Sequence, residues 1–141
     1  ALQQTGLMLT LSHYHRLVVM VEHCVNCSHD PVVKHAGHDE HEYSQTFHAT
    51  AAATYAVFAP MVAGTGMKVE VHPVSQNPRL ASFEVEYMLF QCGSDGQMRH
   101  CGHGKLWSKL ETRRWPDTGQ LAKRLFTAVQ ADLVLPPSQA R

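Results

Sequence analysis

The feature that most constrains the fold is a short apolar run that leads directly into a pair of cysteines. Residues 17–21 read LVVMV, a continuous β-branched segment that is typical of a strand buried on both faces. The run stops at Glu22-His23, and Cys24-Val25-Asn26-Cys27 follows at once. A polar stretch over residues 28–42 and an amphipathic pattern come next. We therefore expect the Cys-x-x-Cys pair to lie between a buried strand and a helix.

Apolar periodicity predicts the next elements. Apolar residues spaced by three or four predict an amphipathic helix over residues 43–59, ended near Pro60 and Gly64. Alternating apolar and polar residues predict strands at 67–71 and 82–90.

The last third of the chain contains a glycine-rich segment and a second helical pattern. Residues 91–104 hold four glycines and are expected to form an irregular hairpin connection, followed by a short strand over 105–110. Asp117, with Gln120 three residues later as a capping box, is expected to open a final helix that Pro136-Pro137 ends. The order β-α-β-β-β-α predicts an α/β (α+β) two-layer sandwich, a four-stranded mixed sheet covered by two helices.

Length and composition narrow the class of protein. The chain has 141 residues, enough for one domain and one core. Twelve Lys+Arg against twelve Asp+Glu give zero net charge, which removes the simplest electrostatic case for a nucleic-acid partner. No run of 18 apolar residues occurs, so we expect no transmembrane segment. The first eleven residues lack the basic start of a secretory signal, and we expect a cytoplasmic protein.

Four cysteines are too few for a disulfide scaffold, so the Cys-x-x-Cys pair points to redox or metal chemistry. A helix N-terminus stabilises a thiolate, and two intervening residues let the sulfurs meet in a disulfide. His23 and His29 flank the pair and, when protonated, would lower a thiol pKa further. Half of a zinc site is the main alternative, and two structural thiols come last.

Three segments carry a resemblance to a known family: residues 16–27 (RLVVMVEHCVNC), 78–86 (PRLASFEVE) and 104–116 (GKLWSKLETRRWP). The first is similar to the opening strand and motif, the second to the third strand, and the last to the closing strand and the aromatic-proline turn before the final helix, of the selenoprotein W (Rdx) family, including its cysteine-containing members. The segments occur in the family's order, with a helix predicted in each gap where the family has one.

The resemblance implies a thioredoxin-like fold and thiol-dependent redox work. Its partners would be protein or small-molecule thiols and disulfides, with glutathione or a thioredoxin system as electron donor. It makes Cys24 and Cys27 the catalytic pair. Selenium occupies the second motif position in selenoprotein members, which is Cys27 here, whereas the first cysteine attacks in thioredoxins. Both roles therefore stay open, as does the oligomeric state.

The resemblance also sets the expected domain limits. Residues 1–15 would be an N-terminal extension, residues 16–135 a single domain, and residues 136–141 a tail. Insertions are expected near 28–42 and 88–103. Asp30-Pro31 is a helix-start signature, and a helix that begins at Pro31 would leave Cys27 in the preceding loop.

The first insertion contains a histidine pattern. His35, His38 and His41 are spaced i, i+3 and would line one face of a helical turn, with Asp39, Glu40, Glu42 and His48 near enough in sequence to add ligands. Three imidazoles can hold zinc, nickel or copper. A solvated histidine-rich loop is the favoured interpretation, because Gly37 interrupts the pattern.

The second insertion contains Cys92, His100, Cys101 and His103. These are metal-ligand types without a recognised spacing. A Cys92–Cys101 disulfide, two exposed thiols, or a four-thiolate zinc set with Cys24 and Cys27 are the alternatives.

Three other side chains are assigned structural roles. Trp107 and Trp115 are interpreted as packing aromatics, and His72 as an edge or core histidine satisfied by backbone.

Three functions compete. The first is a thiol oxidoreductase that uses Cys24 and Cys27. The second is a non-catalytic, redox-responsive binding module whose insertions carry the interaction. The third is a metal-binding protein that uses the histidine-rich insertion or the segment from Cys92 to His103. The eleven histidines belong mainly to the two insertions.

Overall fold

The computed structural model describes residues 13–24, 40–74 and 76–134. Their elements follow one another along the chain as β1 (His13–His23), α3 (Glu40–Thr65), β2 (Lys68–Pro73), β3 (Phe83–Gly93), β4 (Met98–Ser108), α4 (Lys109–Thr112) and α5 (Thr118–Val134). Within these ranges the elements follow the expected β-α-β-β-β-α order, with the one-turn helix α4 added before α5. The strand β1 begins at His13, inside the expected extension.

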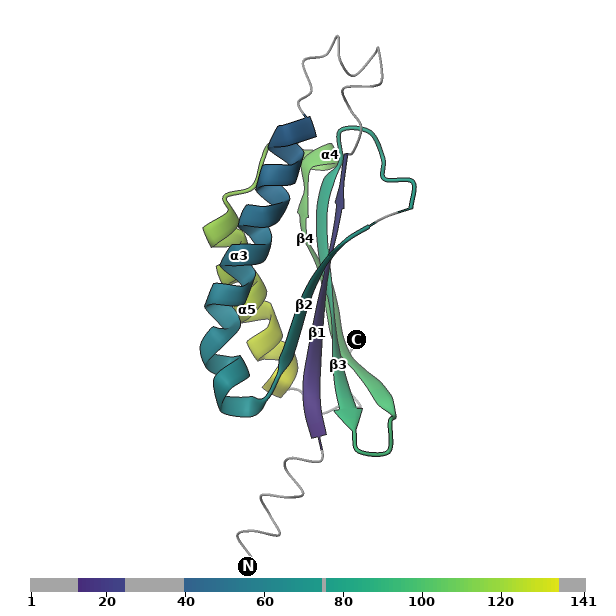
Figure 1. Ribbon diagram of the computed structural model, residues 1–141, viewed down its shortest axis with the longest axis vertical. Helices are drawn as coiled ribbons and strands as arrows, with labels where there is room; N and C mark the ends of the chain where they lie inside the picture. Colours follow the sequence, from purple (N-terminus) through teal and green to yellow (C-terminus); the bar gives the residue numbers. More distant parts are fainter. Residues whose placement is uncertain (1–12, 25–39, 75, 135–141) are drawn as a thin grey trace, which may run out of the picture.

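The four strands form one mixed sheet in the order β2-β1-β3-β4. β1 runs parallel to β2 and antiparallel to β3, and β3 is antiparallel to β4. The long helices α3 and α5 lie side by side on the same face of this sheet (Figure 1). The chain is therefore a mixed α+β domain of two layers.

The core lies between the two layers. Leu17, Val19 and Val21 of β1 point into it, and their partners on β3 do the same. The residues of β1 that alternate with them differ: Val18 is 9% exposed and Met20 is half-buried. The expectation of a strand buried on both faces is therefore only partly correct, because both long helices cover the same face.

Helix α3 is longer than predicted at both ends and runs through Pro60. Proline has a φ angle that suits a helix, and its missing N–H removes only one backbone hydrogen bond. The apolar pattern in the sequence does not show the full buried face of this helix, because two of the buried residues are threonines. Thr50 and Thr54 donate their hydroxyls to the carbonyls four residues earlier, both at 2.8 Å, so each side chain enters the core with its polar group satisfied.

Residues 91–104 form a hairpin, as expected, but most of them belong to its two strands, so the expected irregular connection is wrong. β3 continues to Gly93, and a tight turn joins it to β4, in which Gly93 N–H donates to the Gln97 carbonyl at 2.9 Å. Gly96 has a φ of 81°, a conformation that glycine tolerates. Two register shifts, between Val85 and Glu86 and between Leu89 and Phe90, interrupt the pairing. Such irregularities break the period-two pattern on which strand prediction depends.

The segment from β4 to α5 is organised by capping. Ser108 is the N-cap of α4, and Arg113 ends that turn in the left-handed conformation. Asp117 Oδ1 accepts the backbone N–H of Gln120 at 3.0 Å, so the predicted cap of α5 is confirmed. The predicted strand over 105–110 ends earlier, at Ser108.

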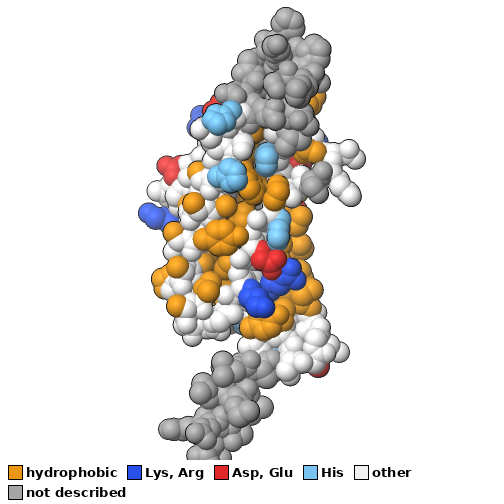
Figure 2. Space-filling view, in the orientation of Figure 1, with side chains coloured by type: hydrophobic (Ala, Val, Ile, Leu, Met, Phe, Trp, Pro, Cys, Tyr) orange, Lys and Arg blue, Asp and Glu red, His pale blue; other side chains and the backbone are white. Residues whose placement is uncertain are grey.

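The other face of the sheet carries polar side chains. Arg16 of β1 forms a two-pronged ion pair with Glu70 of β2, and the Glu70 carboxylate also contacts His72 Nε2 at 2.9 Å. Figure 2 shows basic side chains beside an acidic one over the β2 edge of the sheet. His72 is thus an exposed edge histidine, as expected, but its partner is a carboxylate and not the backbone.

Candidate functional site

Cys24 lies directly after the last residue of β1 and is 1% exposed. Its backbone N–H donates to the Ser82 carbonyl at 3.0 Å, which continues the β1–β3 pairing by one step. Cys24 is disulfide-bonded. Cys27, His29, the Asp30-Pro31 helix start, His35 and His38 lie outside the described residues.

The segment before β3 is fixed against the end of β1. Arg79 donates its backbone N–H at 2.7 Å and its guanidinium Nη2 at 2.8 Å to the two carboxylate oxygens of Glu22. These hydrogen bonds hold the pKa of Glu22 below its usual value. Ala81 has a φ of 62°, and Ser82 is fully buried. The contacts between Arg79 and Glu22 therefore fix the segment that carries Ser82, whose carbonyl accepts the Cys24 N–H.

An aromatic cluster with a lysine ammonium group beside it lies at the same end of the sheet as Cys24. Tyr43 packs edge-on against Trp115 with ring centroids 4.6 Å apart, and Phe83 contacts Trp115 at 5.6 Å. Lys109 Nζ lies 5.0 Å from the Trp115 ring centroid and donates to Tyr43 Oη at 2.9 Å and to the Ala81 carbonyl at 3.3 Å. The ammonium group therefore contacts the backbone of Ala81, the residue before Ser82, and the Ser82 carbonyl accepts the Cys24 N–H. This also confirms Trp115 as a packing aromatic.

His23 is the flanking histidine that the structure describes. Its Nδ1 lies 3.3 Å from the Cys24 carbonyl oxygen, and its ring contacts the Phe47 ring at 5.2 Å. The imidazole therefore adjoins the cysteine backbone and is held by α3.

Cys92 and Cys101 belong to a different part of the sheet. Both are free and buried, so the Cys92–Cys101 disulfide and the two exposed thiols of the sequence interpretation are wrong. Cys92 pairs with Tyr14, ten residues before Cys24 on β1, which at about 3.3 Å per residue is roughly 30 Å away. A four-thiolate site with Cys24 is therefore excluded. Burial raises the pKa of the Cys101 thiol.

The register shift in β4 brings two of the histidines together. His100 pairs with Phe90 and His103 with Met88, and the two imidazole centroids are 5.1 Å apart. His41 lies at the start of α3, and its Nε2 atom is 3.0 Å from Gln45 Nε2. Within the ranges that the structure describes, no three His, Cys, Asp or Glu side chains are grouped to hold a metal ion.

Sequence reasoning missed Lys109, Glu22, Arg79 and Ser82. Arg79 and Ser82 lie inside the segment 78–86 that carries the family resemblance, and Lys109 lies inside 104–116. Their contacts join residues more than 20 positions apart, so no local pattern could have shown them.

Fold and site together define a mixed α+β domain with a disulfide-bonded cysteine at the carboxyl end of its first strand. No family model matches the chain, and no curated protein or solved structure matches it either. Among the helices of the described residues, none has the length and apolar character needed to cross a membrane.

Proposed function

We propose that the protein is a thiol–disulfide redox protein of the selenoprotein W (Rdx) type, with a thioredoxin-like fold and a Cys24/Cys27 centre. The element order β-α-β-β-β-α supports the fold assignment. The proposal includes a cytoplasmic setting, where glutathione supplies reducing equivalents.

The observation that carries the proposal is the contrast between the cysteines. Cys24 is oxidised in a disulfide at the carboxyl end of β1, whereas Cys92 and Cys101, at the far end of the same sheet, are free thiols. A disulfide at the end of a strand and ahead of a helix has the position of a redox centre. A disulfide that only stabilises the fold is less needed here, because the core is packed with apolar side chains.

The burial of Cys24 supports one assignment of the two roles within the pair. An attacking thiol must be accessible to its partner, and Cys24 is 1% exposed. Cys24 therefore suits the resolving thiol, and Cys27 becomes the attacking one. The resemblance agrees, since the second motif position carries selenium in selenoprotein members.

The reaction then has two steps. The Cys27 thiolate attacks one sulfur of a substrate disulfide, forming a mixed disulfide and releasing the first substrate thiolate. The Cys24 thiolate attacks the Cys27 sulfur, closing the intramolecular disulfide and releasing the second thiolate. The substrate gains two electrons. Two molecules of a thiol such as glutathione restore the dithiol and are themselves oxidised to a disulfide.

A trapping experiment tests both the function and the roles. The Cys24→Ser variant, treated with a disulfide substrate such as oxidised glutathione, should accumulate a mixed disulfide on Cys27 that mass spectrometry detects. The Cys27→Ser variant should accumulate much less. Cys92→Ala is the matched control, because it removes a buried thiol at the far end of the sheet. The proposal fails if Cys27→Ser traps as much adduct as Cys24→Ser, or if neither forms one.

A further inference from the structure

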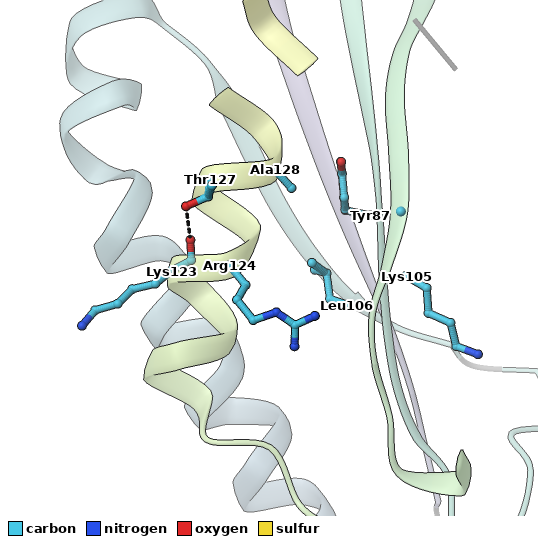
Figure 3. Close-up of a pocket in the computed structure, with 8 residues that line it drawn as sticks. Tyr87, Lys105, Leu106, Lys123, Arg124, Thr127 and Ala128 are labelled. Atoms are coloured by element: carbon cyan, nitrogen blue, oxygen red, sulfur yellow. Dashed lines mark hydrogen bonds between the residues drawn. The ribbon is translucent and has the colours of Figure 1, made fainter. Parts of the chain in front are cut away.

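A groove lies between the outer strand β4 and the helix α5. Its volume is ≈ 500 Å³, within the range of about 300–1,000 Å³ that is usual for ligand sites. The side chains and backbone that matter to its chemistry are Tyr87, Gly104 and Leu106 from the sheet and Arg124, Thr127 and Ala128 from the helix (Figure 3). No residue of the Cys24 site lines it.

One wall of the groove is a sheet edge. β4 is the last strand in the order β2-β1-β3-β4, and in the described part of the chain no strand pairs with its outer side. Residues 102–105 pair regularly with β3, between the two register shifts. Alternate backbone N–H and C=O groups of these residues therefore point away from β3, which is the arrangement that accepts an added strand. The irregularities at each end limit such a strand to about four residues.

The floor of the groove is apolar and shallow beside Gly104. A Cβ atom there would lie 2.9 Å from Tyr87 Cε1, so glycine is what lets the strand backbone approach the tyrosine ring. Tyr87 Oη donates to Asp132 Oδ2 at 2.6 Å, and Thr127 Oγ1 donates to the Lys123 carbonyl at 3.1 Å. Both hydroxyls therefore donate their hydrogen within the protein and are not available as donors to a ligand. The groove thus offers the ring of Tyr87, Leu106 and Ala128 to a small apolar side chain.

The residues that line the groove include three basic ones, Lys105, Lys123 and Arg124, and no acidic one. The carboxylate of Asp132 lies beside the groove and accepts the Tyr87 hydroxyl. Arg124 extends from α5 toward Leu106 and β4, whereas Lys123 points away from the groove (Figure 3). Lys105 is paired with Glu111 at 3.0 Å. Among the described residues the guanidinium of Arg124 has no ion-pair partner, so it is the group available to a carboxylate.

We propose that the β4–α5 groove binds an extended acidic peptide segment of a partner protein, which adds to β4 as a further strand and places a carboxylate against Arg124. A strand that continues the sheet would direct every second side chain toward the helix-covered face. Those side chains would reach the groove and the guanidinium. This binding site is independent of the thiol centre and needs neither Cys24 nor Cys27.

The test is an NMR titration of the full chain, carrying both Cys24→Ser and Cys27→Ser to remove the thiol centre, with the acetylated and amidated hexapeptide Thr-Val-Thr-Glu-Thr-Val, which presents valine and glutamate on the same face when extended. Amide shifts should centre on residues 102–105 and on Arg124. Arg124→Gln should weaken binding about tenfold, as loss of one charge-assisted hydrogen bond implies. Lys123→Gln, the same charge change on the neighbouring residue, should weaken it less than about twofold through screened long-range charge.

Backbone recognition is tested with N-methylated peptides. A strand uses the N–H groups of only one edge, so methylation of one alternate set of residues should abolish binding and methylation of the other set should leave it intact. Equal effects of the two sets, equal effects of Arg124→Gln and Lys123→Gln, or shifts centred elsewhere would each overturn the proposal. So would absence of binding at about 1 mM peptide, the weak end of useful affinity, or self-association of the chain that Arg124→Gln disrupts.

Discussion

Gly102 shows how one residue permits a contact between the two layers. A Cβ atom at this position would lie 2.1 Å from Asp132 Oδ2 and 2.9 Å from Asp132 Cβ. The absence of a side chain lets Asp132 of α5 reach the sheet and accept the Tyr87 hydroxyl at 2.6 Å. Burial, first of all, and this hydrogen bond raise the pKa of Tyr87 above its usual value.

Gly102→Ala should therefore displace Asp132 and break its hydrogen bond with Tyr87, lowering the free energy of unfolding by about 1–3 kcal/mol. Urea denaturation followed by circular dichroism measures the change. Gly64→Ala is the control, because a Cβ atom there meets nothing within 4 Å and helix propensity favours alanine by up to about 1 kcal/mol. Equal effects of the two substitutions would contradict the assigned role of Gly102.

Glu70 gives the fold a dependence on pH. Hydrogen bonds from Arg16 first, and from His72, lower the pKa of the Glu70 carboxyl from 4.5 to about 2. Because the folded pKa lies below the unfolded one, the stabilisation is complete above pH 4.5 and is lost as the pH falls toward 2.

Glu70→Gln should therefore lower the free energy of unfolding at pH 7 by no more than about 1 kcal/mol, since the pair is about one-third exposed. The difference from the unsubstituted protein should shrink as the pH falls from 4.5 toward 2. Thermal unfolding at several pH values measures it. Glu111→Gln, which removes an exposed surface pair with Lys105, should change stability little. A deficit of Glu70→Gln that persists at pH 2 would refute this account.

At the scale of elements, α3 departs most from an ideal helix. Pro60 lies inside it and leaves one carbonyl without its usual partner. Because Pro60 is exposed, replacement by alanine removes no core contact. Pro60→Ala should raise the free energy of unfolding by about 1–3 kcal/mol, which chemical denaturation would show. An unchanged or lower stability would mean that Pro60 bends α3 onto the sheet and that this bend improves packing.

The order of elements was predictable because each long element has a local apolar period. Val19 and Val21 show the buried strand, and Tyr43 and Phe58 show the buried side of α3. The ends of the elements were not predictable from the same patterns. Thr50 and Thr54 look polar in sequence but are buried through their own helix, and the hairpin around Gly96 combines strand pairing with register shifts that hide its period.

Over the whole molecule, the cysteine pair could be singled out from sequence, but its surroundings could not. Lys109 reaches Ala81 and Tyr43 across the fold, and Arg79 reaches Glu22. These contacts depend on the register with which β1 pairs with β3, and the local sequence does not determine that register. The separation of Cys92 and Cys101 from Cys24 likewise appears only once the register of β1 with β3 is known.

Lys109 should contribute to the electrostatics of the Cys24 end of the sheet. Its ammonium group contacts the Ala81 carbonyl, next to the residue that accepts from the Cys24 N–H. Nearby positive charge stabilises a thiolate, so Lys109→Met should raise the lower thiol pKa of the reduced Cys24/Cys27 pair by up to about one unit. Alkylation rates as a function of pH would report it. Lys105→Met, which removes a cation from β4, is the matched control and should leave the rates unchanged.

The central claim is that Cys24 and Cys27 form a reversible redox centre. The most direct measurement is a redox titration of the folded protein in glutathione buffers, with the two thiols counted by alkylation and mass spectrometry. We expect a single two-electron transition that Cys92→Ala leaves in place and that Cys24→Ser and Cys27→Ser each abolish. A pair that cannot be oxidised to an intramolecular disulfide without unfolding the protein, or a transition that survives both substitutions, would contradict the account.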